Sequence, residues 1–121
     1  AYKHGMEMLA GEVEQLLEQD EPVIVGGDFN VDARQDQVDG AMPDVALGAL
    51  GCKNAYRQTG FAGIDSATGT HENTSRIIDY LIPCGLGVES VQIVGGDDKK
   101  DVRWWHGSDH KPVATKLVAE S

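Results

Sequence analysis

Five polar residues beside apolar segments have side chains that can do chemistry. Asp28 and Asn30 follow a β-branched run, and Asp79 lies inside another apolar segment. Asp109 and His110 immediately precede the last apolar segment. Carboxylates can deprotonate water or hold a hard divalent cation, an amide can donate hydrogen bonds to an anion, and an imidazole exchanges protons near neutral pH. These five residues are the candidate site, provided that the fold gathers them.

A short predicted strand positions the first two of these residues. The β-branched run at residues 23–25, closed by a proline on one side and two glycines on the other, predicts a strand buried on both faces. Side chains alternate along a strand, so we expect Asp28 and Asn30 to project to one side and Phe29 into the core. The glycines would let a substrate approach the backbone closely. The alternative is an Asp/Asn turn that merely ends the strand.

Asp79 is the polar member of a second predicted strand, at residues 77–83. A carboxylate in an apolar run is costly to bury without a hydrogen-bonding partner. The partner can be another site residue, which makes Asp79 functional. The structural alternative is a pairing with Arg76 or with a backbone amide.

The remaining pattern predicts three helical segments and two further strands. Apolar residues at helical spacing predict helices at 6–17 and 42–50, with another turn at 54–58. Alternation predicts strands at 88–94 and 112–119. Polar or glycine-rich composition predicts loops at 31–40 and 59–73 and a hinge at 95–103.

Two metal motifs are suggested by spacing but do not fit. Residues 28–39 begin like a calcium-binding loop, D-x-N-x-D, but Ala33 stands where a glycine turn is needed and Asp39 where a bidentate glutamate is needed. His106 and His110 are four residues apart, as in a helical zinc site, but Gly107 between them disfavours a helix. Trp104 and Trp105 beside them could line a pocket, although packed tryptophans are more common.

Length, composition and charge limit the class of protein. With 121 residues, 40% hydrophobic and 25% charged, the chain is one globular domain at most. No apolar run reaches membrane-spanning length and no signal-peptide pattern is present, which leaves the compartment open. The net charge is −10, and the acidic residues concentrate in residues 1–44, so this segment should not bind a nucleic acid backbone tightly by charge alone.

The cysteines and the first residues give two further expectations. Cys52 and Cys84 form no metal-binding spacing, and we expect two small buried hydrophobic residues, with a disulfide as the less favoured alternative. The chain begins with Ala1 and enters a helical pattern without a capping residue. We therefore expect that it starts inside a larger protein.

Three short motifs, in this order, carry a resemblance to a known family. They are G-G-D-F-N at 26–30, R-I-I-D-Y at 76–80 and G-S-D-H-K-P-V at 107–113. They resemble motifs in the C-terminal half of the endonuclease/exonuclease/phosphatase superfamily, the metal-dependent phosphoesterases that include pancreatic-type deoxyribonuclease and abasic-site endonucleases. The resemblance implies an α/β fold, with a mixed β-sheet and helices on one face, that is half of a four-layer α/β/β/α sandwich (DNase I-like). Residues 1–121 would be the C-terminal portion of that domain, with the N-terminal half absent.

The resemblance also implies a role for each candidate residue. Asp28 would orient or deprotonate the attacking water, and Asn30 would hydrogen-bond an oxygen of the scissile phosphate. Asp109 would help to hold a divalent cation, Mg²⁺ or Mn²⁺. His110 would contact the phosphate and assist proton transfer, and Asp79 would bond its imidazole and fix the tautomer. Such a division suits a negatively charged phosphoester, which needs a cation, hydrogen-bond donors and a base for water.

Two departures from the family pattern matter. Arg76 lies three residues before Asp79 instead of two, so strand alternation directs it to the opposite face, away from its usual supporting role. The family's principal metal-binding glutamate, an asparagine and a second catalytic histidine belong to the N-terminal half. We therefore expect little or no activity from this chain alone, and dimerisation or aggregation through an exposed apolar sheet face.

The expected function of the full-length parent is thus metal-dependent hydrolysis of a phosphoester, of nuclease or phosphatase type. Nucleic acid, phospholipid and small phosphodiester substrates all stay open. The alternative is a non-catalytic binding or assembly module that retains the family scaffold. The complete set of polar residues argues against a degenerate site, because such groups are costly to keep buried.

Overall fold

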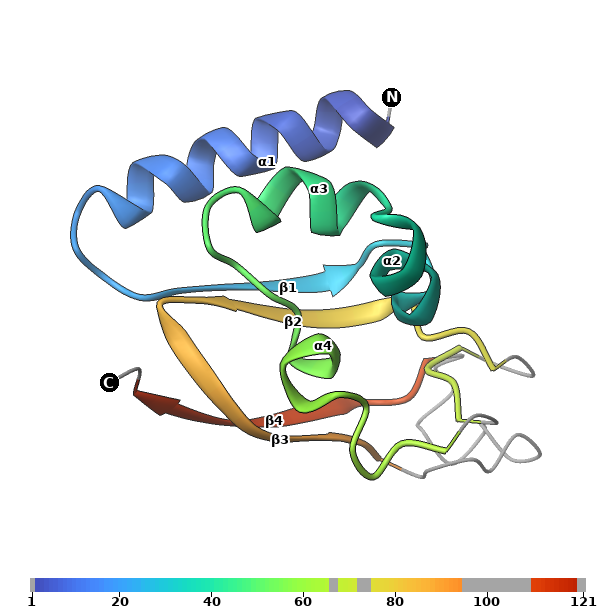
Figure 1. The fold of residues 1–121 in the computed structure, drawn as a ribbon. Coiled ribbons are helices and arrows are strands. Elements are labelled where there is room, and N and C mark those ends of the chain that lie inside the picture. Colours follow the sequence, from blue (N-terminus) through green and yellow to red (C-terminus); the bar gives the residue numbers. More distant parts are fainter. Residues whose placement is uncertain (1, 66–67, 72–74, 95–109, 120–121) are drawn as a thin grey trace.

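A computed structural model describes residues 2–65, 68–71, 75–94 and 110–119. Figure 1 shows the elements in chain order. They are α1 (Tyr2–Leu17), β1 (Val23–Asp28), α2 (Ala33–Asp39), α3 (Met42–Gly48), α4 (Ala55–Thr59), β2 (Asp79–Cys84), β3 (Leu86–Ile93) and β4 (Val113–Ala119). The expected α/β class is confirmed. Among the described residues, no helix is both long enough and apolar enough to cross a bilayer.

The strands form two antiparallel ladders. β1 pairs with β2, from Val23 opposite Cys84 to Asp28 opposite Asp79, and β3 pairs with β4. Gly85 adopts a φ of 81° between β2 and β3, a conformation that glycine tolerates, and there the chain passes from one ladder to the other (Figure 1). The mixed pairing expected from the sequence is not found among the described strands.

The β1–β2 ladder buries one face and exposes part of the other. Val25 is only 9% exposed, whereas its neighbour Ile24 is 48% exposed. The sequence expectation of a strand buried on both faces is therefore wrong for this chain. Close packing explains the glycine at position 26, because a Cβ there would lie 3.2 Å from Cδ2 of Leu81, its cross-strand partner.

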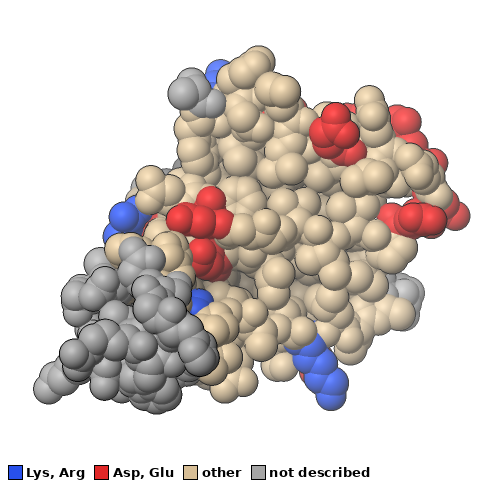
Figure 2. Space-filling view, turned by 180° about the vertical axis from the view of Figure 1, so that it is seen from behind, with Lys and Arg blue, Asp and Glu red and all other residues tan. Residues whose placement is uncertain are grey.

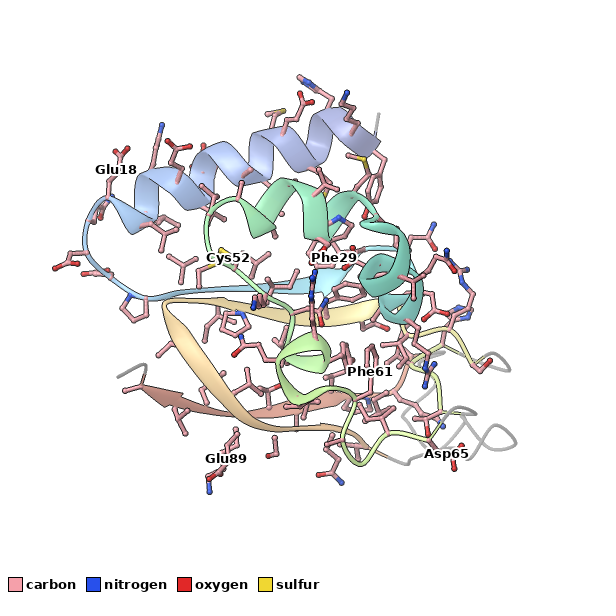
Figure 3. All side chains as sticks on the ribbon, in the orientation of Figure 1. Glu18, Phe29, Cys52, Phe61, Asp65 and Glu89 are labelled. Atoms are coloured by element: carbon pink, nitrogen blue, oxygen red, sulfur yellow. A yellow bond between two sulfur atoms is a disulfide. The ribbon has the colours of Figure 1, made fainter. Side chains whose placement is uncertain are left out.

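The core lies between the helices and the buried face of the ladder. Tyr56 of α4 and Tyr80 of β2 are almost fully buried, and their rings meet edge to face with centroids 6.1 Å apart. Phe29, which follows β1, packs on Tyr80 with a centroid distance of 5.2 Å. The prediction that Phe29 turns into the core is confirmed (Figure 3). These aromatic contacts tie α4, β1 and β2 into one core.

Helix α2 occupies a segment that the sequence analysis expected to be a loop. Asp32 caps its N-terminus by accepting a hydrogen bond from the Arg34 N–H at 3.2 Å. Gly40 ends the helix in the left-handed conformation with a φ of 62°. Both are ordinary capping signals, but the intervening residues carry no apolar stripe that would have revealed the helix.

Cys52 and Cys84 form a disulfide, which corrects the expectation of two free buried thiols. Cys52 lies between α3 and α4 (Figure 3), and Cys84 is the last residue of β2. Their Cα atoms are 4.3 Å apart, and both residues are at most 2% exposed. Tertiary structure brings together two residues that are 32 positions apart in sequence.

Reduction of this disulfide is expected to destabilise the chain by roughly 3–4 kcal/mol, because the open chain regains the entropy of a 32-residue loop. The midpoint of thermal unfolding should fall by roughly 15 °C. The measurement is calorimetry with and without a reductant. A Cys52→Ala/Cys84→Ala double variant is the control, since its unfolding should not respond to the reductant. Equal midpoints for the oxidised and reduced wild-type chain would contradict the prediction.

A buried carboxylate joins the three short helices. Asp36 of α2 is 0% exposed and accepts hydrogen bonds from the Asp44 N–H of α3 at 3.0 Å and from Asn54 Nδ2 at 3.4 Å. Asn54 in turn caps α4 by accepting from the Arg57 N–H at 2.7 Å. Arg57 also pairs with the Asp44 side chain. Burial is the main cause that raises the pKa of Asp36 to about 6.

This raised pKa predicts a pH dependence of stability with a defined sign. The folded state binds the Asp36 proton more tightly than the unfolded state does. The protonated carboxyl therefore adds to the free energy of unfolding below about pH 4, and this stabilisation is lost as the pH rises to about 6. Asp36→Asn removes that stabilisation, which is at most about 3 kcal/mol. Urea unfolding at pH 4 to 7 should show the variant gaining stability relative to wild type. Parallel pH profiles, with exposed Asp20→Asn as the control, would refute the assignment.

Candidate active site

The register of the β1–β2 ladder places two of the predicted site residues opposite each other. Asp28 is the last residue of β1 and pairs with Asp79, the first residue of β2. Cross-strand partners on one face of an antiparallel pair have neighbouring side chains. Two carboxylates therefore meet at the end of the ladder that lies beside α2 (Figure 1).

His110 completes this cluster from a third segment. Its Nδ1 lies 2.7 Å from Oδ2 of Asp79, and its Nε2 lies 3.8 Å from Oδ2 of Asp28. The side chains of Asp28, His110 and Asp79 are 46%, 31% and 21% exposed, so the cluster is open to solvent on the Asp28 side. A carboxylate accepting from Nδ1–H fixes the tautomer of an imidazole. The geometry thus leaves Nε2 as the atom of His110 that faces Asp28.

Asn30 lies beside the cluster, but not for the reason that the sequence suggested. β1 ends at Asp28 and Asn30 has a φ of 56°, so strand alternation does not extend to it. Its backbone N–H donates to Oδ1 of Asp28 at 2.8 Å. This is an Asx-type turn, the alternative considered for the segment, and it holds the Asp28 carboxylate in place as well as ending the strand.

Arg76 supports this turn, contrary to the expectation from its spacing. β2 begins only at Asp79, so strand alternation does not reach Arg76. Its Nη2 donates to the Asn30 carbonyl at 3.1 Å. The extra residue in R-I-I-D-Y therefore does not turn the arginine away from the site.

Two buried residues that sequence reasoning missed hold the backbone of Asp79. Thr70 is fully buried, and its Oγ1 accepts from the N–H groups of Ile78 and Asp79 at 2.9 and 3.3 Å. The Tyr56 hydroxyl donates to the Asp79 carbonyl at 2.7 Å. Burial, followed by the charge of Asp79, raises the pKa of Tyr56, which keeps this donor protonated. No spacing in the sequence links either residue to Asp79.

His71, which lies in none of the three motifs, is a neighbour of His110. The two backbones form an antiparallel bridge, and the imidazole rings have centroids 4.9 Å apart with planes at 78°. A second imidazole therefore lies beside the cluster, and no sequence motif predicted it.

The donor atoms of the cluster suit a divalent cation. Asp28, Asp79 and His110 each offer one ligand atom within 4.8 Å of the others. Carboxylate oxygens are the ligands that Mg²⁺ and Mn²⁺ prefer. Asp109, the residue expected to help hold the cation, lies outside the described residues, as do Trp104, Trp105 and His106.

Charge is unevenly distributed over the surface. Seen from behind, one group of acidic side chains lies at the left of the view and another lies at the end where α1 leads into β1 (Figure 2). A broad, largely uncharged surface lies between these groups (Figure 2).

Comparison with known proteins identifies the family and the fold. Residues 6–110 match the Endonuclease/Exonuclease/phosphatase family. A crystal structure of a protein of this family from Bacteroides thetaiotaomicron aligns with a TM-score of 0.60 and 23% identity, covering 94% of this chain and 42% of that one. A mannosyl-6-phosphatase from the same organism aligns with a TM-score of 0.58 and 23% identity, covering 90% and 44%. No curated protein matches the sequence.

The α/β fold thus carries an Asp–His–Asp cluster at the end of a β ladder. The chain belongs to the Endonuclease/Exonuclease/phosphatase family, as the motif resemblance implied. It spans less than half the length of the two solved structures to which it is similar.

Proposed function

We propose that the full-length protein containing this chain hydrolyses phosphate esters with the help of Mg²⁺ or Mn²⁺. The observation that carries this proposal is the meeting of Asp28, Asp79 and His110, from three distant segments, in a member of this family. Electrostatic stabilisation, a base for water and a proton donor are what phosphoester hydrolysis requires of an enzyme.

Each side chain has a defined task in this proposal. Asp79 accepts from Nδ1–H of His110 and thereby keeps Nε2 available for a phosphate oxygen or for a proton. Asp28, whose carboxylate is the most exposed of the three, orients or deprotonates the attacking water. The Asn30 amide donates to a phosphate oxygen, from a turn fixed by its own N–H and by Arg76.

The cation would be held by Asp109 together with carboxylate oxygen of the cluster and with ligands from the rest of the domain. When bound, it supplies positive charge against the phosphate. His110 Nδ1 is engaged by Asp79, which leaves Nε2 for the phosphate in this proposal.

We further propose that residues 1–121 are the C-terminal portion of the catalytic domain. The chain covers only 42% and 44% of the two similar structures, and Ile24 on the uncovered face of β1 is 48% exposed. The remainder of the domain would pack on this face and complete the site. The isolated chain should therefore have little activity and should dimerise through the same face. A monodisperse monomer in light scattering would argue against this use of the face.

The substrate class is proposed only as a phosphate ester. One structurally similar protein is a mannosyl-6-phosphatase, which makes a small phosphoester the first substrate to try. The net charge of −10 favours a small phosphoester over duplex DNA, because DNA binding relies on basic side chains. Phospholipid and single-stranded nucleic acid complete the panel.

The test is hydrolysis of this panel by the full-length protein, with Mg²⁺, with Mn²⁺ and after chelation. Activity should require the cation, and Asp28→Ala should reduce it by at least about a hundredfold. Glu89→Ala is the matched control: Glu89 forms an exposed ion pair with Lys116, and its replacement is expected to leave activity unchanged. Substrate binding without any turnover would instead support a non-catalytic binding module.

A further inference from the structure

His71 is held beside His110 by its own backbone and by its neighbours. The Thr70 N–H donates to the Arg76 carbonyl at 3.0 Å, and the Thr70 carbonyl accepts from the Lys111 N–H at 2.8 Å. The segment that carries His71 thus runs between the chain entering β2 and the chain that carries His110. The backbone hydrogen bonds hold the two segments together, and this arrangement brings the two imidazoles into contact.

The orientation of His110 depends on contacts to its ring as well as on its hydrogen bond to Asp79. The hydrogen bond restrains Nδ1, and packing against the ring limits rotation of the imidazole about the Cβ–Cγ bond. A ring that packs edge to face on the flank of the imidazole opposes such rotation, and tilted aromatic pairs of this kind are favourable. With centroids 4.9 Å apart and planes at 78°, His71 is placed to do this.

We propose that His71 is a positioning residue: its ring holds the His110 imidazole so that Nε2 stays directed toward Asp28. This inference rests on the proposed function, since it assigns His71 a task at the same site. His71 acts through His110, because its ring packs edge to face on the His110 ring.

The test compares His71→Phe, which keeps an aromatic ring, with His71→Ala, which removes it, in the full-length protein. His71→Ala should lower kcat about three- to tenfold with KM changed less than twofold, and His71→Phe should recover most of kcat. A general loss of folding would affect both variants, and their thermal unfolding midpoints identify it.

A second readout does not depend on turnover. In NMR spectra, the proton between His110 Nδ1 and Asp79 should exchange with water several times faster in His71→Ala than in wild type, and at the wild-type rate in His71→Phe. Unchanged exchange and kcat in His71→Ala would overturn the proposal, as would equal loss in both variants, which would assign the role to a ring nitrogen. If wild type hydrolyses no ester, the proposed function fails, while the exchange rates still decide the role of His71.

Discussion

Replacing His110 with glutamine is expected to lower kcat of the full-length protein by about 10²–10⁴-fold, the range that general acid–base catalysis contributes. Glutamine can still accept or donate a hydrogen bond near Asp79 but cannot exchange a proton near neutral pH. Since Nε2 of His110 faces Asp28 across 3.8 Å, the loss should fall on kcat more than on KM. Steady-state kinetics with saturating cation measure it.

His4→Gln is the matched control for this substitution. His4 lies on the exposed side of α1, so the same chemical change there should leave kcat within about twofold of wild type. If His110→Gln and His4→Gln gave the same kcat, the site assignment would be wrong, whatever the family of the protein.

Replacing Asp79 with asparagine should have an effect of the same order, about 10²–10⁴-fold in kcat, for a different reason. An amide can donate its own N–H to Nδ1 of His110, which favours the tautomer with the proton on Nε2 and directs the wrong atom at the substrate. The geometry of the site would survive, because the Asp79 backbone is held by Thr70 and Tyr56 and not by its carboxylate.

The control is Asp20→Asn in the turn between α1 and β1. Asp20 has a φ of 60°, which asparagine also tolerates, so neither folding nor kcat should change. Retention of activity in Asp79→Asn would mean that the 2.7 Å contact with His110 serves stability alone. In that case unfolding measurements would show the loss that kinetics did not.

The elements of the fold were largely predictable because each has a local cause. The apolar stripe of α1 and the β-branched start of β1 are visible in the sequence, and the structure has both. α2 was not predicted, because the residues between its caps, Asp32 and Gly40, include no apolar residues at helical spacing. The buried face of β1 was misjudged because a run of three β-branched residues does not show which face meets a partner.

The proximity of three candidate residues was predictable, and the detailed geometry around them was less so. Asp28, Asp79 and His110 were expected to meet, and the distances place them together. Asn30 was expected to follow strand alternation, but the strand ends two residues earlier and a turn holds it instead. Arg76 was expected to point away, yet it reaches the same turn.

By itself, the sequence determined the chemical types at the site and the strands that end beside them, because motifs and hydrophobic periods are properties of neighbouring residues. Only the tertiary structure decided the long-range contacts: Thr70 and Tyr56 behind Asp79, His71 against His110, and, at the other end of the ladder, the disulfide between Cys52 and Cys84. The physical reason is that a hydrogen bond, a ring contact or a disulfide between distant positions depends on proximity in three dimensions. The type of a single residue does not indicate which distant residue will contact it in the folded chain.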